Sequence, residues 1–161
     1  MLAVYIDADA CPVKEDIFRI SKRYGLIVHV VSNQEKFLPR ADWILPVVVP
    51  EGFDAVDDYI EANIQPLDIV ITNDLLLAAR CLKKEAKVID PRGRVLDEDN
   101  IGDALANREL MAELRQMGAL DTGPKKMGKN HHSRFKSSFD ELIVAIRKSQ
   151  GLTQGPAAKA D

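Results

Sequence analysis

The fold of this 161-residue chain is indicated by residues 2–9, which read Leu-Ala-Val-Tyr-Ile-Asp-Ala-Asp. A short apolar run that stops at an acid is typical of a buried strand ending at the edge of a sheet. Pro12 then suits the first turn of a helix, and the glycine at position 25 is a typical helix end. The sequence therefore predicts a strand and then a helix.

Strands and helices continue to alternate along the chain. We expect further strands over 26–31, 43–49, 68–71 and 87–89, and helices over 53–64, 75–85, 101–117 and 133–149. Strands joined in this way by helices pair in parallel through right-handed crossovers. The predicted fold class is α/β, a three-layer sandwich with a mostly parallel central sheet. We expect one domain over residues 1–149, with an exposed loop at 118–129 and a disordered tail at 150–161.

Composition excludes several classes of protein. The hydrophobic fraction is 46% and the charged fraction 29%, values that are ordinary for a globular domain. There is no run of 18 apolar residues and no basic segment before Asp7, so we expect neither a membrane span nor a signal peptide. Cys11 and Cys81 form neither a disulfide framework nor a paired zinc motif. We therefore expect a cytoplasmic protein with no membrane partner.

Charge is distributed unevenly around a net value of −3. Acidic residues are in excess over 1–100, whereas basic residues are in excess over 122–150. Aromatic residues make up only 6% and show no spacing typical of a base-stacking surface. Any contact with RNA is thus expected to depend on phosphates.

Carboxylates follow two of the predicted strands. Asp7 and Asp9 come after the first strand, and Asp74 follows the strand at 68–71. If these strands are parallel neighbours, the acids meet at one edge of the sheet, where each pair repels by roughly 4 kcal/mol at an intermediate dielectric. A cation relieves this repulsion, and oxygen ligands select Mg²⁺ or Mn²⁺. The three acids are therefore the predicted metal ligands and catalytic residues.

Helix capping is the alternative explanation for these acids. Asp9 could cap the helix that follows it, and Asp74 or Thr72 could cap the next one. Capping explains Asp7 less well, because Asp7 precedes the cap position.

A second group of acids lies at the start of the helix over 53–64. Asp54 is the expected cap, and Asp57 and Asp58 share one helix face with it. Either Asp57 or Asp58 could add a metal ligand at the same edge. Asp99 is the expected cap of the helix over 101–117.

Several polar or basic residues could bind a substrate phosphate. The predicted substrate-binding set is Lys14, Thr72, Asn73, Arg80, Arg92, Lys129, His132 and Arg134. The alternatives are structural: Lys14 and Arg80 could pair with nearby acids, and the histidines could lie in a solvated loop. Cys11 is expected to be a small packed side chain rather than a nucleophile.

Six separated motifs resemble those of the bacterial YaiI/YqxD family over residues 2–147. They are Asp7-Ala-Asp-Ala-Cys-Pro-Val-Lys14, Gly52-Phe-Asp-Ala-Val-Asp-Asp58, Thr72-Asn-Asp74 with Leu77-Ala-Ala-Arg-Cys-Leu82, Pro91-Arg-Gly93, Asp99-Asn-Ile-Gly102 and Ser133-Arg-Phe135. That family in turn resembles PIN-like domains, which are metal-dependent nucleases. The resemblance implies a PIN-like fold with Asp7 and Asp74 at the metal, and a Mg²⁺- or Mn²⁺-dependent ribonuclease. RNA as the partner rests on this resemblance alone.

Two other functions remain open from the sequence. A haloacid-dehalogenase-like phosphatase would use Asp7 as nucleophile and Asp9 as acid, but Lys83 and Lys84 lie far along their helix from the strand ends. A non-catalytic module that binds RNA or protein would need none of the metal ligands.

Overall fold

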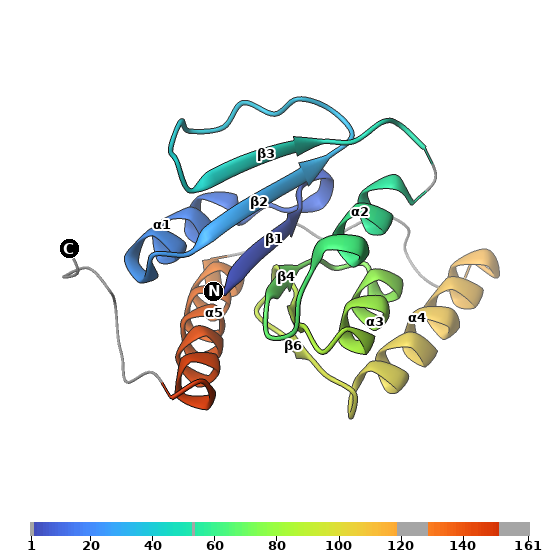
Figure 1. Ribbon diagram of the computed structural model, residues 1–161. Coiled ribbons are helices and arrows are strands. Elements are labelled where there is room, and N and C mark those ends of the chain that lie inside the picture. Colours follow the sequence, from blue (N-terminus) through green and yellow to red (C-terminus); the bar gives the residue numbers. More distant parts are fainter. Residues whose placement is uncertain (1, 53, 119–128, 152–161) are drawn as a thin grey trace.

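A computed structural model describes residues 2–52, 54–118 and 129–151 of the chain. Its centre is a six-stranded sheet with the strand order β3-β2-β1-β4-β5-β6 (Figure 1). The strands are β1 (Ala3–Asp7), β2 (Ile27–Ser32), β3 (Ile44–Val48), β4 (Ile69–Ile71), β5 (Lys87–Ile89) and β6 (Val95–Leu96). The first five are parallel, and β6 pairs antiparallel with β5.

Helices cover both faces of the sheet. The helices are α1 (Lys14–Tyr24), α2 (Ala55–Asn63), α3 (Leu75–Lys83), α4 (Ile101–Gln116) and α5 (Lys129–Ser149), with a short 3₁₀ turn, η1 (Ala8–Ala10), after β1. One apolar core joins α1 and α5 to the sheet, and a second core joins α2, α3 and α4 to its other face. The predicted three-layer α/β sandwich is confirmed.

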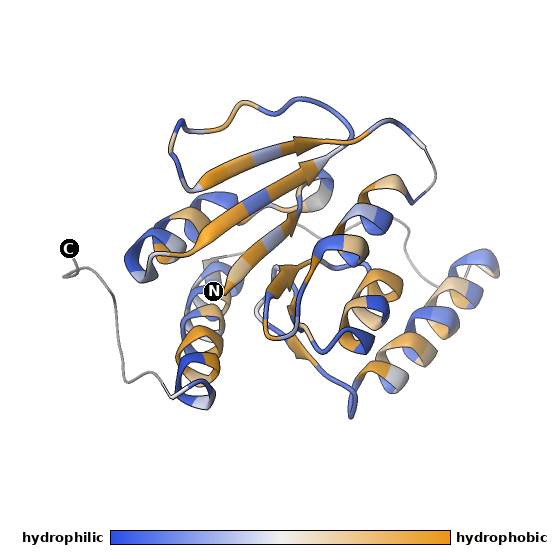
Figure 2. Ribbon diagram, in the orientation of Figure 1, coloured by the Kyte–Doolittle hydropathy of each residue, from blue (hydrophilic) through white to orange (hydrophobic). Residues whose placement is uncertain are grey.

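Alternate side chains of β1 belong to different cores. Val4 and Ile6 pack toward α1 and α5, whereas Tyr5 packs toward α2 and α3. Figure 2 shows the result as apolar strands enclosed by helices with polar outer surfaces. Asp7, the next residue on the Tyr5 side, is therefore directed toward α2 and α3.

The neighbouring strands at the centre of the sheet position the candidate site. β1 pairs with β4 in parallel, with Ile6 opposite Ile71. From β1 the chain builds outward through β2 to β3, and then returns to the other side of β1 with β4. Ligands in open α/β sheets bind beyond the carboxyl ends of the strands at such a reversal of strand order. The expectation that the strands ending near residues 6 and 71 are parallel neighbours is confirmed.

Two local predictions agree with the structure. β3, which contains Pro46, is one of the two edge strands of the sheet. At an edge, the amide hydrogen that proline lacks need not be part of a hydrogen bond to a neighbouring strand. Gly25 ends α1 in a left-handed conformation (φ 70°), and its amide donates to the Lys22 carbonyl.

α2 begins at Ala55, and Asp54 occupies its cap position as expected, although its side chain makes no capping bond. The expected cap of α4 and the expected start of α5 are wrong. α4 follows Asn100, and it is Asp97 that accepts hydrogen bonds from the amides of Asp99 and Asn100, both at 2.9 Å. Asp99 is therefore not the cap, since Asn100 occupies that position. The carboxylate of Asp97 organises the turn that precedes the helix.

Helix α5 starts at Lys129, four residues earlier than expected, so the two histidines lie on a helix and not in a loop. Its first turns pack against the turn after β5. A Cβ added to Gly93 (φ 92°) would lie 2.8 Å from the Arg134 carbonyl carbon. This close backbone contact is a tertiary constraint that helical periodicity does not report.

No helix in the described segments is long and apolar enough to cross a membrane. Residues 119–128, which include most of the expected loop with Lys125 and Lys126, lie outside the described residues. The same holds for residues 152–161 of the expected tail.

Candidate active site

Thr72 connects the carboxyl ends of β1 and β4. Its Oγ1 donates a hydrogen bond of 2.9 Å to Asp7 Oδ2 and accepts one of 2.9 Å from the Asp74 amide. Thr72 itself is buried. The hydroxyl therefore fixes one carboxylate directly and the backbone of the next acid at the same time.

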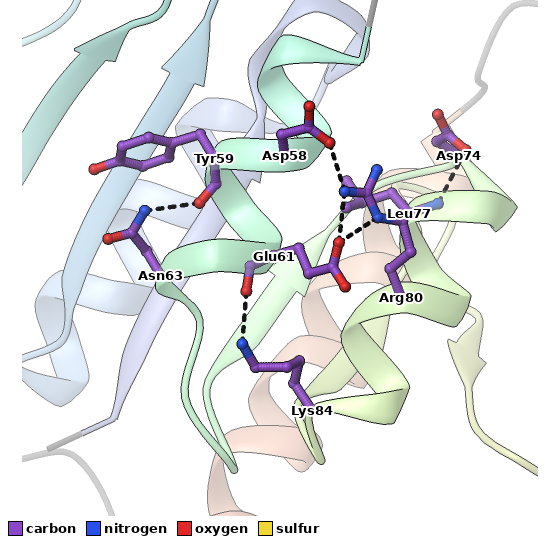
Figure 3. A network of polar contacts seen from close by, with 8 residues as sticks. All are labelled: Asp58, Tyr59, Glu61, Asn63, Asp74, Leu77, Arg80 and Lys84. Atoms are coloured by element: carbon purple, nitrogen blue, oxygen red, sulfur yellow. Dashed lines mark hydrogen bonds and ion pairs between the residues drawn. The ribbon is translucent and has the colours of Figure 1, made fainter.

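Asp74 caps α3, as the capping alternative predicted. Its Oδ1 accepts from the amides of Leu76 (2.9 Å) and Leu77 (3.2 Å). Within the described ranges its Oδ2 makes no hydrogen bond, and Figure 3 shows that oxygen directed away from the helix. Capping and ligand binding are compatible, because each uses a different oxygen.

Asp57 is the third member of this group. It is buried on α2, and burial, followed by the charges of Asp74, Asp7 and Asp54, raises its pKa to about 6. Burial also raises the pKa of Asp7; the Thr72 hydrogen bond partly offsets this rise, and the charges of Asp74 and Asp9 add smaller increases. The charge of Asp74 thus disfavours the charged forms of both Asp7 and Asp57, and we call Asp7, Asp57 and Asp74 the acidic cluster.

Asp9 contacts two residues of the segment that follows β2. Its Oδ1 forms an ion pair with Lys36 at 3.1 Å, and its Oδ2 accepts from the Asn33 amide at 3.4 Å. Asp9 thus holds the segment after β2 and does not cap α1, whose cap position is Val13.

Asp58 and Arg80 also satisfy each other. Arg80 of α3 forms ion pairs with two acids of α2, Asp58 (2.6 Å) and Glu61 (2.5 Å), as Figure 3 shows. These ion pairs raise the pKa of the guanidinium. The structural alternative for Arg80 therefore accounts for its contacts, and of the two α2 acids Asp57 is the one in the cluster.

The remaining substrate-binding candidates come from several different elements. Lys14 Nζ donates to the carbonyls of Ala8 (3.3 Å) and Cys11 (3.1 Å). Arg92 contacts His131 at 3.4 Å, on the turn before β6. Asn73 and Arg134 are exposed, and the side chain of Lys129 lies outside the described part of the molecule.

His132 and Cys11 are both close to α1. His132 Nδ1 lies 3.2 Å from Asp16 Oδ2, which joins α5 to the start of α1. Cys11 is buried, and burial raises its pKa to about 11, so it remains a protonated thiol at neutral pH. The prediction of a packed Cys11 is confirmed.

Three residues that organise this region were not singled out in the sequence. They are Lys36, Glu61 and Asp16, which pair with Asp9, Arg80 and His132 respectively. Glu61 carried a signal, since it lies one helical turn after Asp58 on the same face. No sequence pattern pointed to Lys36 or Asp16, because their partners are distant in the sequence or lie on another element.

The acids provide oxygen ligands of the type that a hard cation prefers. Their side chains do not point toward one common position. Carboxylate oxygens are the ligands that Mg²⁺ and Mn²⁺ prefer. As the side chains stand, no three His, Cys, Asp or Glu residues in the described ranges are arranged to hold a metal ion. Ligation by the acidic cluster would require its carboxylates to rotate toward one point.

Comparison with known proteins places the chain in a family. Residues 5–145 match the model of a family described as "Uncharacterized BCR, YaiI/YqxD family". A UPF0178 protein of Paramagnetospirillum magneticum is 49% identical over 92% of this chain and 98% of its own length. Another, from Gluconobacter oxydans, is 46% identical over 92% of this chain and 85% of its own. No solved structure matches the chain significantly. The chain belongs to the YaiI/YqxD family.

Proposed function

We propose that this protein is a Mg²⁺- or Mn²⁺-dependent phosphodiesterase that acts on RNA. The observation that carries the proposal is the acidic cluster at the junction of β1 and β4. Two of its carboxyl groups, those of Asp7 and Asp57, have pKa values raised by burial and by neighbouring acids. Because a folded protein gains nothing from this repulsion alone, a cation that neutralises it is the simplest physical reason for the arrangement.

The donor atoms support this assignment. Asp7 Oδ2 is used by Thr72 and Asp74 Oδ1 by the α3 amides, which leaves one oxygen on each side chain for a ligand. When bound, a divalent ion would supply positive charge to a phosphate and lower the pKa of a water molecule. The chain's own part is to hold Asp7 and Asp74 at fixed positions through Thr72. RNA is proposed as the substrate from the resemblance to PIN-like nucleases.

The phosphatase alternative receives less support. It would need Asp9 as a proton donor near Asp7, but Asp9 is engaged with Lys36 at 3.1 Å and with the Asn33 amide.

The test compares Asp7→Asn and Asp74→Asn with Asp103→Asn, an exposed acid on α4. Cleavage of single-stranded RNA is measured with Mn²⁺, with Mg²⁺ and with EDTA. We expect both cluster variants to lose at least about a hundredfold in rate, equal to about 2.7 kcal/mol of barrier, while the control keeps its activity. Cleavage that survives both cluster substitutions would contradict the proposal.

Thermal unfolding provides a readout that does not depend on activity. Ligand bound only by the folded state stabilises it by RT ln(1 + [L]/Kd). Millimolar Mn²⁺ should therefore raise the melting temperature of the unsubstituted protein and of Asp103→Asn, but not that of Asp7→Asn. If Mn²⁺ has no effect on any of them and no cleavage is seen, the non-catalytic alternative is favoured.

A further inference from the structure

A second feature lies on the other face of the sheet, next to the carboxyl end of β1. It is a cavity of 1010 Å³ between the start of α1, residues 37–40 of the connection between β2 and β3, and His132 of α5. Ligand pockets usually enclose about 300–1,000 Å³, so this volume accommodates a group larger than a single side chain.

The walls of this cavity combine apolar and cationic groups. Phe18 and Leu38 provide apolar surface, and Phe37 at the mouth is fully exposed, at 104% of its reference area. Arg40 also lines the cavity and makes no hydrogen bond or ion pair with any described residue. An exposed aromatic ring and an unengaged guanidinium that line the same cavity are groups that can bind a flat ring together with an anion.

The acidic groups of the cavity are Glu15 and Asp16. Asp16 is engaged with His132 at 3.2 Å and with Arg19 at 3.6 Å, while Glu15 is exposed. Lys14 also lines the cavity, but its Nζ donates to the carbonyls of Ala8 and Cys11, whereas Arg40 is a cation with no partner among the described residues.

The same chain segment connects this cavity to the acidic cluster. Cys11 is in the cavity wall, and the charge of Asp7 contributes to the raised pKa of its thiol. Asp9, which lies between them, forms its ion pair with Lys36, the residue before Phe37. A ligand spanning both places would thus follow the carboxyl end of β1 from one face of the sheet to the other.

We propose that this cavity binds an unpaired base of single-stranded nucleic acid, with the base against Phe37 and Arg40 at the neighbouring phosphate. The inference rests on the proposed function, because it assigns a substrate contact to the same strand end. A duplex does not fit the requirement, since its bases are stacked inside and only a splayed base can enter a cavity. This proposal goes beyond the expected contact through phosphates, because one exposed ring at a cavity needs no spaced set of aromatics.

The experiment measures fluorescence anisotropy of labelled oligouridylate, oligothymidylate and a duplex of the same length, in EDTA so that nothing is cleaved. We expect Phe37→Ala to weaken binding of both single strands about tenfold, whereas Phe37→Tyr keeps it. Arg40→Ala should weaken binding and reduce its dependence on salt concentration. The control is Leu110→Ala, an apolar residue on α4 that is also exposed, at 50% of its reference area.

The outcomes separate the two proposals. If Asp7→Asn abolishes cleavage but Phe37→Ala binds as the unsubstituted protein does, the cavity proposal is wrong and the proposed function stands. If the protein binds single strands through Phe37 but never cleaves them, the proposed function fails and the cavity proposal stands. Preference for the duplex, or no binding at protein concentrations up to about 10⁻⁴ M, would overturn the cavity proposal.

Trp43 gives an independent signal for the same event. It is the single tryptophan of the sequence, and its ring packs edge-on against Phe18 with centroids 6.3 Å apart. A base entering the cavity should therefore change Trp43 emission in the unsubstituted protein and less so in Phe37→Ala. Circular dichroism of each variant verifies that it is folded.

Discussion

Thr72 Oγ1 donates a hydrogen bond of 2.9 Å to Asp7 Oδ2, and this bond joins residues 65 positions apart in the sequence. It links the ends of two central strands at the point where strand order reverses. The hydroxyl also accepts from the Asp74 amide, so a single group determines the relative positions of two acids of the cluster.

Replacing Thr72 by Val keeps the shape of the side chain but removes both hydrogen bonds. We expect a loss of about 1–3 kcal/mol in the free energy of unfolding at pH 7, measured by urea denaturation. The hydrogen bond lowers the pKa of Asp7, so its loss raises that pKa further. Part of the deficit should consequently disappear in acid, where Asp7 is protonated. Thr72→Ser retains the hydroxyl and should restore most of the stability; a valine variant as stable as the original would contradict this role.

Asp57→Asn should stabilise the protein above pH 6 when no divalent ion is present. The folded-state pKa of Asp57 is about 6, above its usual value of 3.8, so the folded state loses stability as pH rises between these values. Removing the charge avoids that loss, which is at most about 3 kcal/mol. Melting temperatures measured in EDTA from pH 4 to pH 8 should separate with rising pH, and parallel curves would show that Asp57 is not destabilised by its neighbours.

Gly93→Ala should be strongly destabilising. Its φ of 92° disfavours any side chain, and a Cβ would approach the Arg134 carbonyl carbon and oxygen at 2.8 Å. Backbone atoms of a packed helix cannot move aside, so we expect a cost of about 3 kcal/mol or more, measured by thermal unfolding. Gly102→Ala is the matched control, because nothing lies within 4 Å of its added Cβ in α4. That substitution should be neutral or stabilising by up to about 1 kcal/mol.

Arg80→Lys tests the attachment of α2 to α3. Lysine keeps the charge but cannot reach Asp58 and Glu61 with the same planar fork. Because these groups are partly exposed, we expect a loss of only about 0.5–1 kcal/mol that shrinks at high salt, measured by thermal unfolding. Arg19→Lys, whose exposed side chain pairs with Asp16 within α1, should show no change. An Arg80→Lys variant with unchanged stability would mean that the network of Figure 3 contributes little.

Much of the fold was predictable because local periodicity and strand ends are properties of neighbouring residues. The buried strand before Asp7, the end of α1 at Gly25 and the edge position of Pro46 all follow from such local rules. The start of α5 was misplaced because its second turn, at Arg134, packs against Gly93, some 40 residues earlier in the chain.

The sequence by itself determined the α/β alternation and the presence of acids after two parallel strands, since both depend on hydrophobic spacing and on where apolar runs stop. Only the tertiary structure decided which acids meet. Asp57 joins Asp7 and Asp74 because α2 packs on the face toward which Asp7 is directed, whereas Asp9 and Asp58 are held by Lys36 and Arg80. Pairing between charges distant in sequence depends on how the elements pack, and no local pattern of residues encodes it.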